Sequence, residues 1–153
     1  MNRFEYMKDI FFKMVEDQCF GIMKQKSYFH SIQVMTICQQ LSLKKHLNLE
    51  LVSIMALFHD YSQYVYHSSF QHALKSAQAT KDIMLQSNLF SDEEINCVYQ
   101  AILHHSDKDK IHDDYSELLK DGDIIAQYLA EPDCVLPHHS QQRLNKYLTF
   151  YMK

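Results

Sequence analysis

The amino-acid sequence predicts an all-α fold, a single-domain helical bundle of about six to seven helices. With only 2 glycines and 2 prolines in 153 residues, the chain has few positions for tight turns, so long helices joined by short polar loops are expected. Apolar residues recur every three or four positions along most of the chain. A chain of this length can fold as one domain, residues 1–153, without a disulfide or metal staple.

Three helices are expected in the first half of the chain. The first ends near Gly21, a residue type that often stops or kinks a helix. Asn48 can cap the third helix, which is almost wholly apolar and should be the most buried. Residues 61–69, with three tyrosines, break the helical pattern and are expected to form a loop. The three helices are expected at residues 4–20, about 27–46 and about 49–60.

Further helices are expected in the second half. Ser91 and Glu94 have the spacing of a capping box, in which a serine N-cap is followed three residues later by glutamate. Residues 106–114 form a charged segment that reads as a loop, and Asp114 with Glu117 can cap the helix that follows it. The expected helices span about 70–88, a segment that begins after Ser91, about 115–130 and about 138–152.

Composition and charge exclude several classes of protein. No apolar run is long enough to cross a membrane and the first residues do not resemble a signal peptide, so a cytoplasmic protein with no membrane partner is expected. The four cysteines are widely spaced without a C-x-x-C pair, which argues against zinc-knuckle and thioredoxin-like sites. A net charge of −4 and the lack of a basic stripe argue against a nucleic acid polymer as partner.

The residues with the strongest chemical signal surround the pair His59-Asp60, at the end of the apolar run that begins at Leu51. A single core histidine is more often simply hydrogen-bonded than a metal ligand. Here, however, several metal-competent residues fall on or next to the apolar faces of successive expected helices, and one shared ligand explains all of them. Imidazole and carboxylate groups suit zinc, manganese or iron, and Asp60 can bridge two ions. The candidate ligands are His30, His59, Asp60, His72, His105 and Asp123.

Four short strings of sequence carry a resemblance to a known family. They are Leu57-Phe-His-Asp60, His72-Ala-Leu-Lys-Ser-Ala77, Ala101-Ile-Leu-His-His105 and Leu119-Lys-Asp-Gly-Asp123. Together with His30 they give the order H…HD…H…H…D, which resembles the HD-domain superfamily of metal-dependent phosphohydrolases, an all-α family. The resemblance covers roughly residues 25–130, and its register selects His105 over the neighbouring His104.

The resemblance implies a site for two divalent ions. One ion would be held by His30, His59, Asp60 and Asp123, and the other by Asp60, His72 and His105. Members of the family that have all of these ligands form a binuclear branch, often with iron or manganese. Cobalt, nickel, zinc and magnesium remain alternatives for this chain.

Two departures from the family pattern concern the substrate. Many members continue the His-Asp pair with I-G-K, whereas this chain has Tyr61-Ser-Gln63 and so lacks a lysine that can meet a phosphate. The G-Y-P string of the cyclic-dinucleotide phosphodiesterases is absent as well, which argues against that substrate. Positive charge for a phosphate can come instead from Lys108, Lys110 or Lys120. Lys108, together with Asp60, is the expected catalytic pair.

The sequence therefore predicts a metal-dependent phosphohydrolase of the phosphomonoesterase or phosphodiesterase class. Its substrate is expected to be a small phosphorylated molecule, and a nucleotide is the favoured class. Cleavage of a phosphate ester or anhydride would use metal-activated hydroxide. Two alternatives use the same ligands: a di-iron oxygenase, and a metal-binding or effector-binding module without turnover. The oligomeric state is open, with a homodimer as one alternative.

Overall fold

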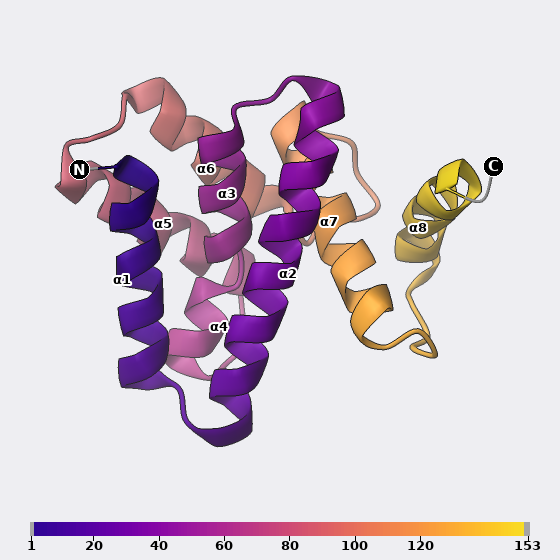
Figure 1. Ribbon diagram of the computed structural model, residues 1–153, viewed down its shortest axis with the longest axis horizontal. Helices are drawn as coiled ribbons and strands as arrows, with labels where there is room; N and C mark the ends of the chain where they lie inside the picture. Colours follow the sequence, from indigo (N-terminus) through magenta and orange to yellow (C-terminus); the bar gives the residue numbers. More distant parts are fainter. Residues whose placement is uncertain (1, 152–153) are drawn as a thin grey trace.

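The computed structural model describes residues 2–151, and over that range its regular structure is entirely helical (Figure 1). The all-α prediction is confirmed. The helix count is higher than expected by one, because a short helix lies where a loop was predicted. The described helices are α1 (Arg3–Gln18), α2 (Gly21–Lys45), α3 (Leu49–Phe58), α4 (Tyr61–Tyr66), α5 (His72–Ser87), α6 (Asp92–His104), α7 (Asp114–Ala130) and α8 (His138–Tyr151).

Helix α2 begins earlier than its sequence pattern indicates. Gly21 was expected to stop or kink a helix and instead is the first residue of α2, with a φ of +55° that favours glycine. The first turn of α2 is largely exposed, with Ile22 and Gln25 on the surface. An exposed turn needs no apolar stripe, so the sequence periodicity could not reveal it and the expected start near residue 27 is wrong.

Helix α3 occupies the centre of the bundle, as predicted. All residues from 51 to 58 are buried, and α3 packs against α1, α2 and α6. The predicted Asn48 cap is confirmed, since its side chain accepts hydrogen bonds from the backbone N–H groups of Glu50 and Leu51. The most apolar segment of the chain therefore becomes the helix around which the others pack.

Helix α4 follows α3 after a single break at residues 59–60 and replaces most of the loop predicted for residues 61–69, of which only residues 67–69 are non-helical. Its Tyr64 is buried and lies edge-on to Phe11 of α1. The backbone N–H of Ser62 donates to Ser76 Oγ on α5 at 2.9 Å, and Ser62 Oγ donates to the His72 carbonyl. These tertiary contacts stabilise a helix of only six residues, too short for its periodicity to stand out in the sequence.

The caps of α6 and α7 largely follow the sequence signals. Ser91 and Glu94 form the predicted capping box at the start of α6. The side chain that caps α7 is Asp113, not the predicted Asp114, because Asp113 Oδ1 accepts from the N–H groups of Tyr115 and Ser116. The two candidates are adjacent carboxylates, and sequence alone does not separate them.

Helix α7 lies against α2, and α8 lies beside α7 at the edge of the bundle (Figure 1). Helices α2 and α7 approach closely at Gly122, because a Cβ atom there would overlap the Cys38 Sγ. Helix α8 contributes to a small separate core of Ile124, Leu136 and Leu144. Within the described range, no helix combines the length and the apolar character needed to cross a bilayer.

Candidate metal centre

The six predicted ligand side chains lie together where four helices meet the break between two others. His30 comes from the middle of α2 and Asp123 from the middle of α7. His59 and Asp60 occupy the break between α3 and α4, and His105 follows the last residue of α6. His72 is the first residue of α5. The chain thus brings metal-competent groups to one centre from positions as far apart as His30 and Asp123, which are separated by 93 residues in the sequence.

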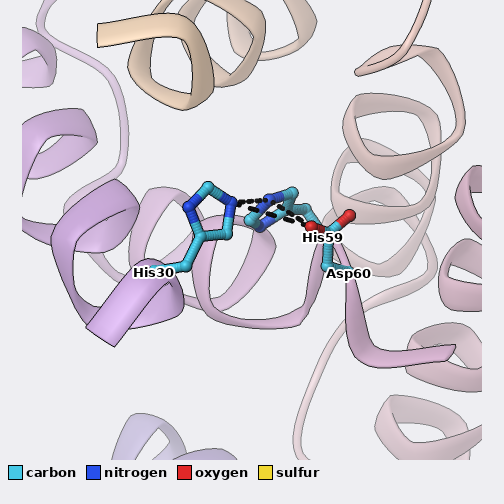
Figure 2. A group of neighbouring side chains, drawn as sticks. All are labelled: His30, His59 and Asp60. Carbon is cyan, nitrogen blue, oxygen red and sulfur yellow. Dashed lines mark hydrogen bonds and ion pairs between the residues drawn. The ribbon is translucent and has the colours of Figure 1, made fainter. Parts of the chain in front are cut away.

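One group of side chains contains two imidazoles and two carboxylates. His30 Nε2 lies 3.2 Å from His59 Nε2 and 3.2 Å from Asp123 Oδ1. Asp60 Oδ2 lies 3.6 Å from His30 Nε2 and 3.4 Å from His59 Nε2. Figure 2 shows the His30 ring reaching from α2 toward the His59 ring, with the Asp60 carboxylate alongside. The four side chains direct their ligand atoms at one small volume.

A second group uses the other oxygen of Asp60. Asp60 Oδ1 lies 3.5 Å from His72 Nε2 and 3.4 Å from His105 Nε2. The two imidazole Nε2 atoms are 3.2 Å apart, and Ser106 Oγ lies 3.1 Å from His72 Nε2. Asp60 therefore has one carboxylate oxygen in each group, which is the arrangement of a bridging ligand.

The backbone fixes the orientation of three imidazole rings. The Nδ1 atoms of His59 and His105 each lie 2.7 Å from the carbonyl oxygen three residues earlier, on Ala56 and Ile102. His72 Nδ1 lies 3.1 Å from the Ser69 carbonyl. A carbonyl oxygen has two lone pairs, so it can accept the ring N–H even where it also accepts a backbone N–H, as the Ile102 and Ser69 carbonyls do. Each ring then carries its proton on Nδ1 and directs the lone pair of Nε2 to the centre.

This donor set fits a divalent cation. With the Nδ1 positions protonated, the Nε2 atoms and the carboxylate oxygens are all acceptors, and acceptors at such short separations repel one another unless a proton or a cation lies between them. Three overlapping groups have ligand atoms within 4.8 Å of one another: His30 with His59 and Asp60, His59 with His105 and Asp123, and Asp60 with His72 and His105. Nitrogen and oxygen donors in this ratio suit iron, manganese or zinc.

The electrostatics of the centre keep its carboxylates ionised. Burial raises the pKa of Asp60, but the charges and hydrogen bonds of His59 and His105 outweigh it and hold that pKa well below the usual value. Burial also raises the pKa of Asp123, and Lys108 with His30 and His59 lowers it well below the usual value. Both carboxylates are therefore ready to bind a cation at neutral pH.

The two fully enclosed histidines differ in their protonation. Burial lowers the pKa of His59, but Asp60 and Asp123 outweigh it and raise that pKa to about 10. Burial lowers the pKa of His105, and the nearby Asp60 does not compensate. Without a cation, a proton on His59 takes the place of the missing positive charge. Binding of a metal ion would release that proton.

Only one of the three lysines expected near a phosphate lies at the centre. Lys108 Nζ donates to Asp123 Oδ2 at 2.7 Å and lines the same cavity as the ligands. Lys110 is largely exposed and pairs with Asp107. Lys120 is fully buried, donates to Glu117 and does not line the cavity. Neither Lys110 nor Lys120 lines the cavity, so the expectation for these two lysines is wrong.

The centre forms the floor of a cavity of about 750 Å³, a size typical of small-molecule sites. Gln63, which stands where many family members have lysine, lines the cavity and offers a neutral amide. The carbonyl Oε1 of Gln33 is buried without a hydrogen-bond partner. Sequence reasoning missed several lining residues because polar side chains on half-exposed helix faces look like ordinary surface. The missed residues include Lys26, Phe29, Gln33 and Gln127.

His104 does not join the ligands, in agreement with the predicted choice of His105. Its ring stacks on the His112 ring with centroids 3.8 Å apart. Ser76, from the string that includes His72, is buried and holds α4 against α5 through its hydroxyl. Ser76 therefore holds the backbone just after Asp60 in place. Its side-chain hydrogen bonds are to Ser62 and not to the ligand atoms.

Two comparisons with known proteins bear on the fold of this chain. Residues 28–134 match the sequence model of the HD domain. The crystal structure of a predicted HD superfamily hydrolase from an uncultured Thermotogales bacterium superimposes with a TM-score of 0.63 at 18% sequence identity. The match covers 99% of this chain and 96% of the other, and at that identity it shows the fold alone. No curated protein matches the chain.

Proposed function

Because this chain belongs to the HD-domain family, we propose that it is a metal-dependent phosphohydrolase acting on a small phosphorylated molecule, with nucleotides as the favoured substrate class. The observation that carries the proposal is the pair of ligand groups that share Asp60 at the floor of the cavity. The solved structure of the predicted hydrolase is consistent with the proposal at the level of fold.

Each side chain at the centre has a role in this proposal. His30, His59, Asp60 and Asp123 would hold one ion, and Asp60, His72 and His105 would hold the other. Ions held there supply positive charge for phosphate oxygens and acidify bound water, so no side-chain nucleophile is required. The hydrogen bonds of His59 and His105 to backbone carbonyls orient both rings before a ligand arrives.

Lys108 would contribute positive charge at the same point. Its ammonium group donates to Asp123 Oδ2 at 2.7 Å and to the Lys120 carbonyl at 3.4 Å, which leaves a third N–H group for a phosphate oxygen. It also balances the charge of Asp123 and holds Oδ2, so that Oδ1 faces His30. Lys108 would thereby offer the contact with phosphate that a lysine at position 63 could make in the family pattern.

The cavity walls support a substrate larger than phosphate itself. Beyond the ligands, the walls offer the aromatic ring of Phe29, the ammonium group of Lys26 and the side-chain amides of Gln33 and Gln127. An aromatic surface with nearby amides suits a base or a sugar, and a lysine at the rim suits a further phosphate. These features favour a nucleotide over a simple phosphate ester.

Phosphate release by reconstituted protein tests the proposal. Purified protein loaded with Mn²⁺, Co²⁺ or Fe²⁺ should release phosphate from members of a panel of nucleotides and phosphate esters, and chelation should abolish the release. Full metal occupancy with no turnover across the panel would contradict hydrolysis and support a binding module. A mixed-valent iron signal in electron paramagnetic resonance, with substrate-dependent oxygen uptake, would instead support a di-iron oxygenase.

Metal content tests the assignment of the ligands. His59→Ala and Asp123→Ala should each lower the metal bound per chain, because each removes a donor from the first group. His72→Ala should lower it from two ions to one. His104→Ala is a matched control that removes a neighbouring histidine outside the centre and should leave metal content unchanged. Unchanged metal content in both His59→Ala and Asp123→Ala would show that the ligand assignment is wrong.

A further inference from the structure

Lys108 lies on a loop whose backbone is held from α8. The loop, residues 105–113, connects α6 to α7 and carries the ammonium group that meets Asp123. Arg143 of α8 donates from Nε to the Lys108 carbonyl at 2.8 Å and from Nη2 to the Lys110 carbonyl at 2.9 Å. The Arg143 side chain thus binds the loop at two backbone carbonyls, one of which belongs to Lys108, the residue that enters the cavity.

Acidic side chains on α7 fix the guanidinium group in turn. Arg143 Nη1 donates to Glu117 Oε2 at 2.8 Å and to Asp121 Oδ1 at 3.1 Å. The hydroxyl of Tyr147, one turn further along α8, donates to Asp121 Oδ2 at 2.7 Å. The Arg143 side chain is only 12% exposed, so these bonds form where water competes weakly.

A buried lysine reaches the same loop from α7. Lys120 has no exposed surface, and its Nζ donates to the Lys110 carbonyl at 2.9 Å, to His112 Nδ1 at 2.7 Å and to Glu117 Oε1 at 2.6 Å. Glu117 therefore receives Arg143 on one oxygen and Lys120 on the other. The loop is held between two cations that share a carboxylate.

We propose that Arg143 is a positioning residue for the reaction, which sets the Lys108 ammonium group over Asp123 at the floor of the cavity. The inference rests on the proposed phosphohydrolase function and assigns part of the site to α8. That helix lies outside the segment that matches the family model, which ends at residue 134. Ser140 of α8 also lines the cavity, so the helix reaches the site at a second point.

The role requires arginine and not simply a positive charge. The planar guanidinium group presents donors in several fixed directions, and here they meet two carbonyls and two carboxylates at once. A lysine at position 143 would keep the charge but reach fewer of these acceptors. The loop would lose at least one of its two anchors, and Lys108 would lose its fixed position.

Kinetics of Arg143→Lys and Arg143→Gln, with Lys108→Met and the double variants, test the proposal. In Mn²⁺-loaded protein we expect Arg143→Lys to lower kcat/KM about 10- to 100-fold, mainly through kcat, as a displaced catalytic group does. Lys108→Met should cause a similar loss. Adding Arg143→Lys to Lys108→Met should then change little, because the residue that Arg143 positions is already absent.

Amide hydrogen exchange gives a second readout that does not depend on turnover. Exchange of residues 107–112 should accelerate in Arg143→Lys and Arg143→Gln and stay unchanged in Lys108→Met. Arg3→Lys is the matched control, because Arg3 forms a comparable network with Glu50 and Glu94 far from the loop. That variant should leave kcat/KM and exchange of the loop unchanged even if the melting temperature falls.

Two outcomes would overturn the inference. One is a full additional loss of kcat/KM when Arg143→Lys is combined with Lys108→Met, which would mean that the two residues act independently. The other is loop exchange that does not respond to either Arg143 variant. If the wild-type protein hydrolyses none of the panel, the proposed function fails, but loop exchange still decides whether Arg143 holds the loop.

Discussion

Asp60 takes part in both ligand groups of the centre. Its Oδ2 atom faces His30 and His59, and its Oδ1 atom faces His72 and His105. It stands at the break between α3 and α4, where its backbone is not bound into either helix interior. The break directs adjacent residues 59 and 60 into the same centre, which neighbours on a continuous helix could not do.

At the residue scale, the unpartnered Oε1 atom of Gln33 leads to a prediction about specificity. A buried acceptor without a donor costs about 1–3 kcal/mol, and Gln33 lines the cavity, so an O–H or N–H group of the substrate can satisfy it. Gln33→Leu should lower kcat/KM for nucleotides roughly 10- to 100-fold. The same variant should hardly change kcat/KM for p-nitrophenyl phosphate, because the nitrophenyl group of the intact ester has no O–H or N–H group to donate to Gln33.

The same variant has a thermodynamic signature. Because Gln33→Leu removes a buried acceptor that lacks a partner, the melting temperature of the substrate-free protein should stay the same or rise. Steady-state kinetics on the two substrates and a thermal scan check both parts. An equal loss of activity on both substrates would show that Gln33 maintains the structure of the site and makes no specific contact with the nucleotide.

At the element scale, the contact between α2 and α7 predicts that one substitution, Gly122→Ala, will destabilise or stabilise the protein depending on the residue at position 38. A methyl group at Gly122 would overlap Cys38 Sγ in a fully buried interface. Gly122→Ala should therefore destabilise the protein by about 1–2 kcal/mol, because overpacking outweighs the gain in helix propensity. In a Cys38→Ala background, the same change should stabilise the protein by up to about 1 kcal/mol.

Denaturant unfolding of the four proteins in this cycle measures the effect. The interaction between the two positions, not either single value, tests the close approach of the helices. If Gly122→Ala had the same effect with and without the cysteine sulfur, α2 and α7 would not meet at this point.

The network between α7 and α8 predicts a dependence of stability on pH. Burial raises the pKa of Glu117, but hydrogen bonds from Arg143 and Lys120 outweigh it and lower the pKa from 4.5 to about 2. A carboxylate with a depressed pKa stabilises the fold fully above its unfolded value, and this contribution falls as the pH drops from about 4.5 toward 2. At neutral pH this contribution is fully present.

Glu117→Gln isolates this contribution. The difference in unfolding free energy between wild type and variant should be greatest above pH 5 and should shrink as the pH falls below the unfolded pKa of 4.5. Denaturant titrations at pH 7, 5 and 3 measure it. A difference that stayed constant over this range would mean that the Glu117 charge contributes nothing to the stability of the fold.

At the scale of the whole molecule, the metal centre should couple binding to stability. Its ligands come from helices along most of the chain, so an ion bound there stabilises only the folded protein. With free metal at about 1,000 times the dissociation constant, the gain is about 4 kcal/mol. For a protein of this size, that gain raises Tm by roughly 10 °C. Thermal scans with Mn²⁺ and with chelator measure the shift, and His59→Ala should remove most of it.

Most of the fold was predictable because the signals are local. Asn48 and the pair Ser91 with Glu94 cap their helices as expected, and the apolar run before His59 becomes the central helix. Helix faces also indicated His30, His72, His105 and Asp123, whereas the break that brings His59 and Asp60 to the same centre was not predicted. Spacing within a helix determines which residues share a face, and each of these faces had an apolar stripe to mark it.

The parts that escaped prediction depend on contacts between distant segments. Nothing near Lys120 in the sequence indicates that a lysine there will be fully buried, since its acceptors include a backbone carbonyl ten residues earlier. Arg143 meets carbonyls 33 and 35 residues away. Helix α4 is similarly stabilised by its packing on α1 and α5. Such features become visible only when the chain is folded.

The small core beneath α8 has a consequence for how the protein loses activity on heating. Ile124, Leu136 and Leu144 form a cluster separate from the main core, so detachment of α8 exposes far less apolar surface than global unfolding. Brief local openings at this corner will therefore outnumber complete unfolding events. Each one would release Arg143 from the loop while the rest of the bundle stays intact. On heating, catalytic power should fade at temperatures where the helices still give a full circular dichroism signal.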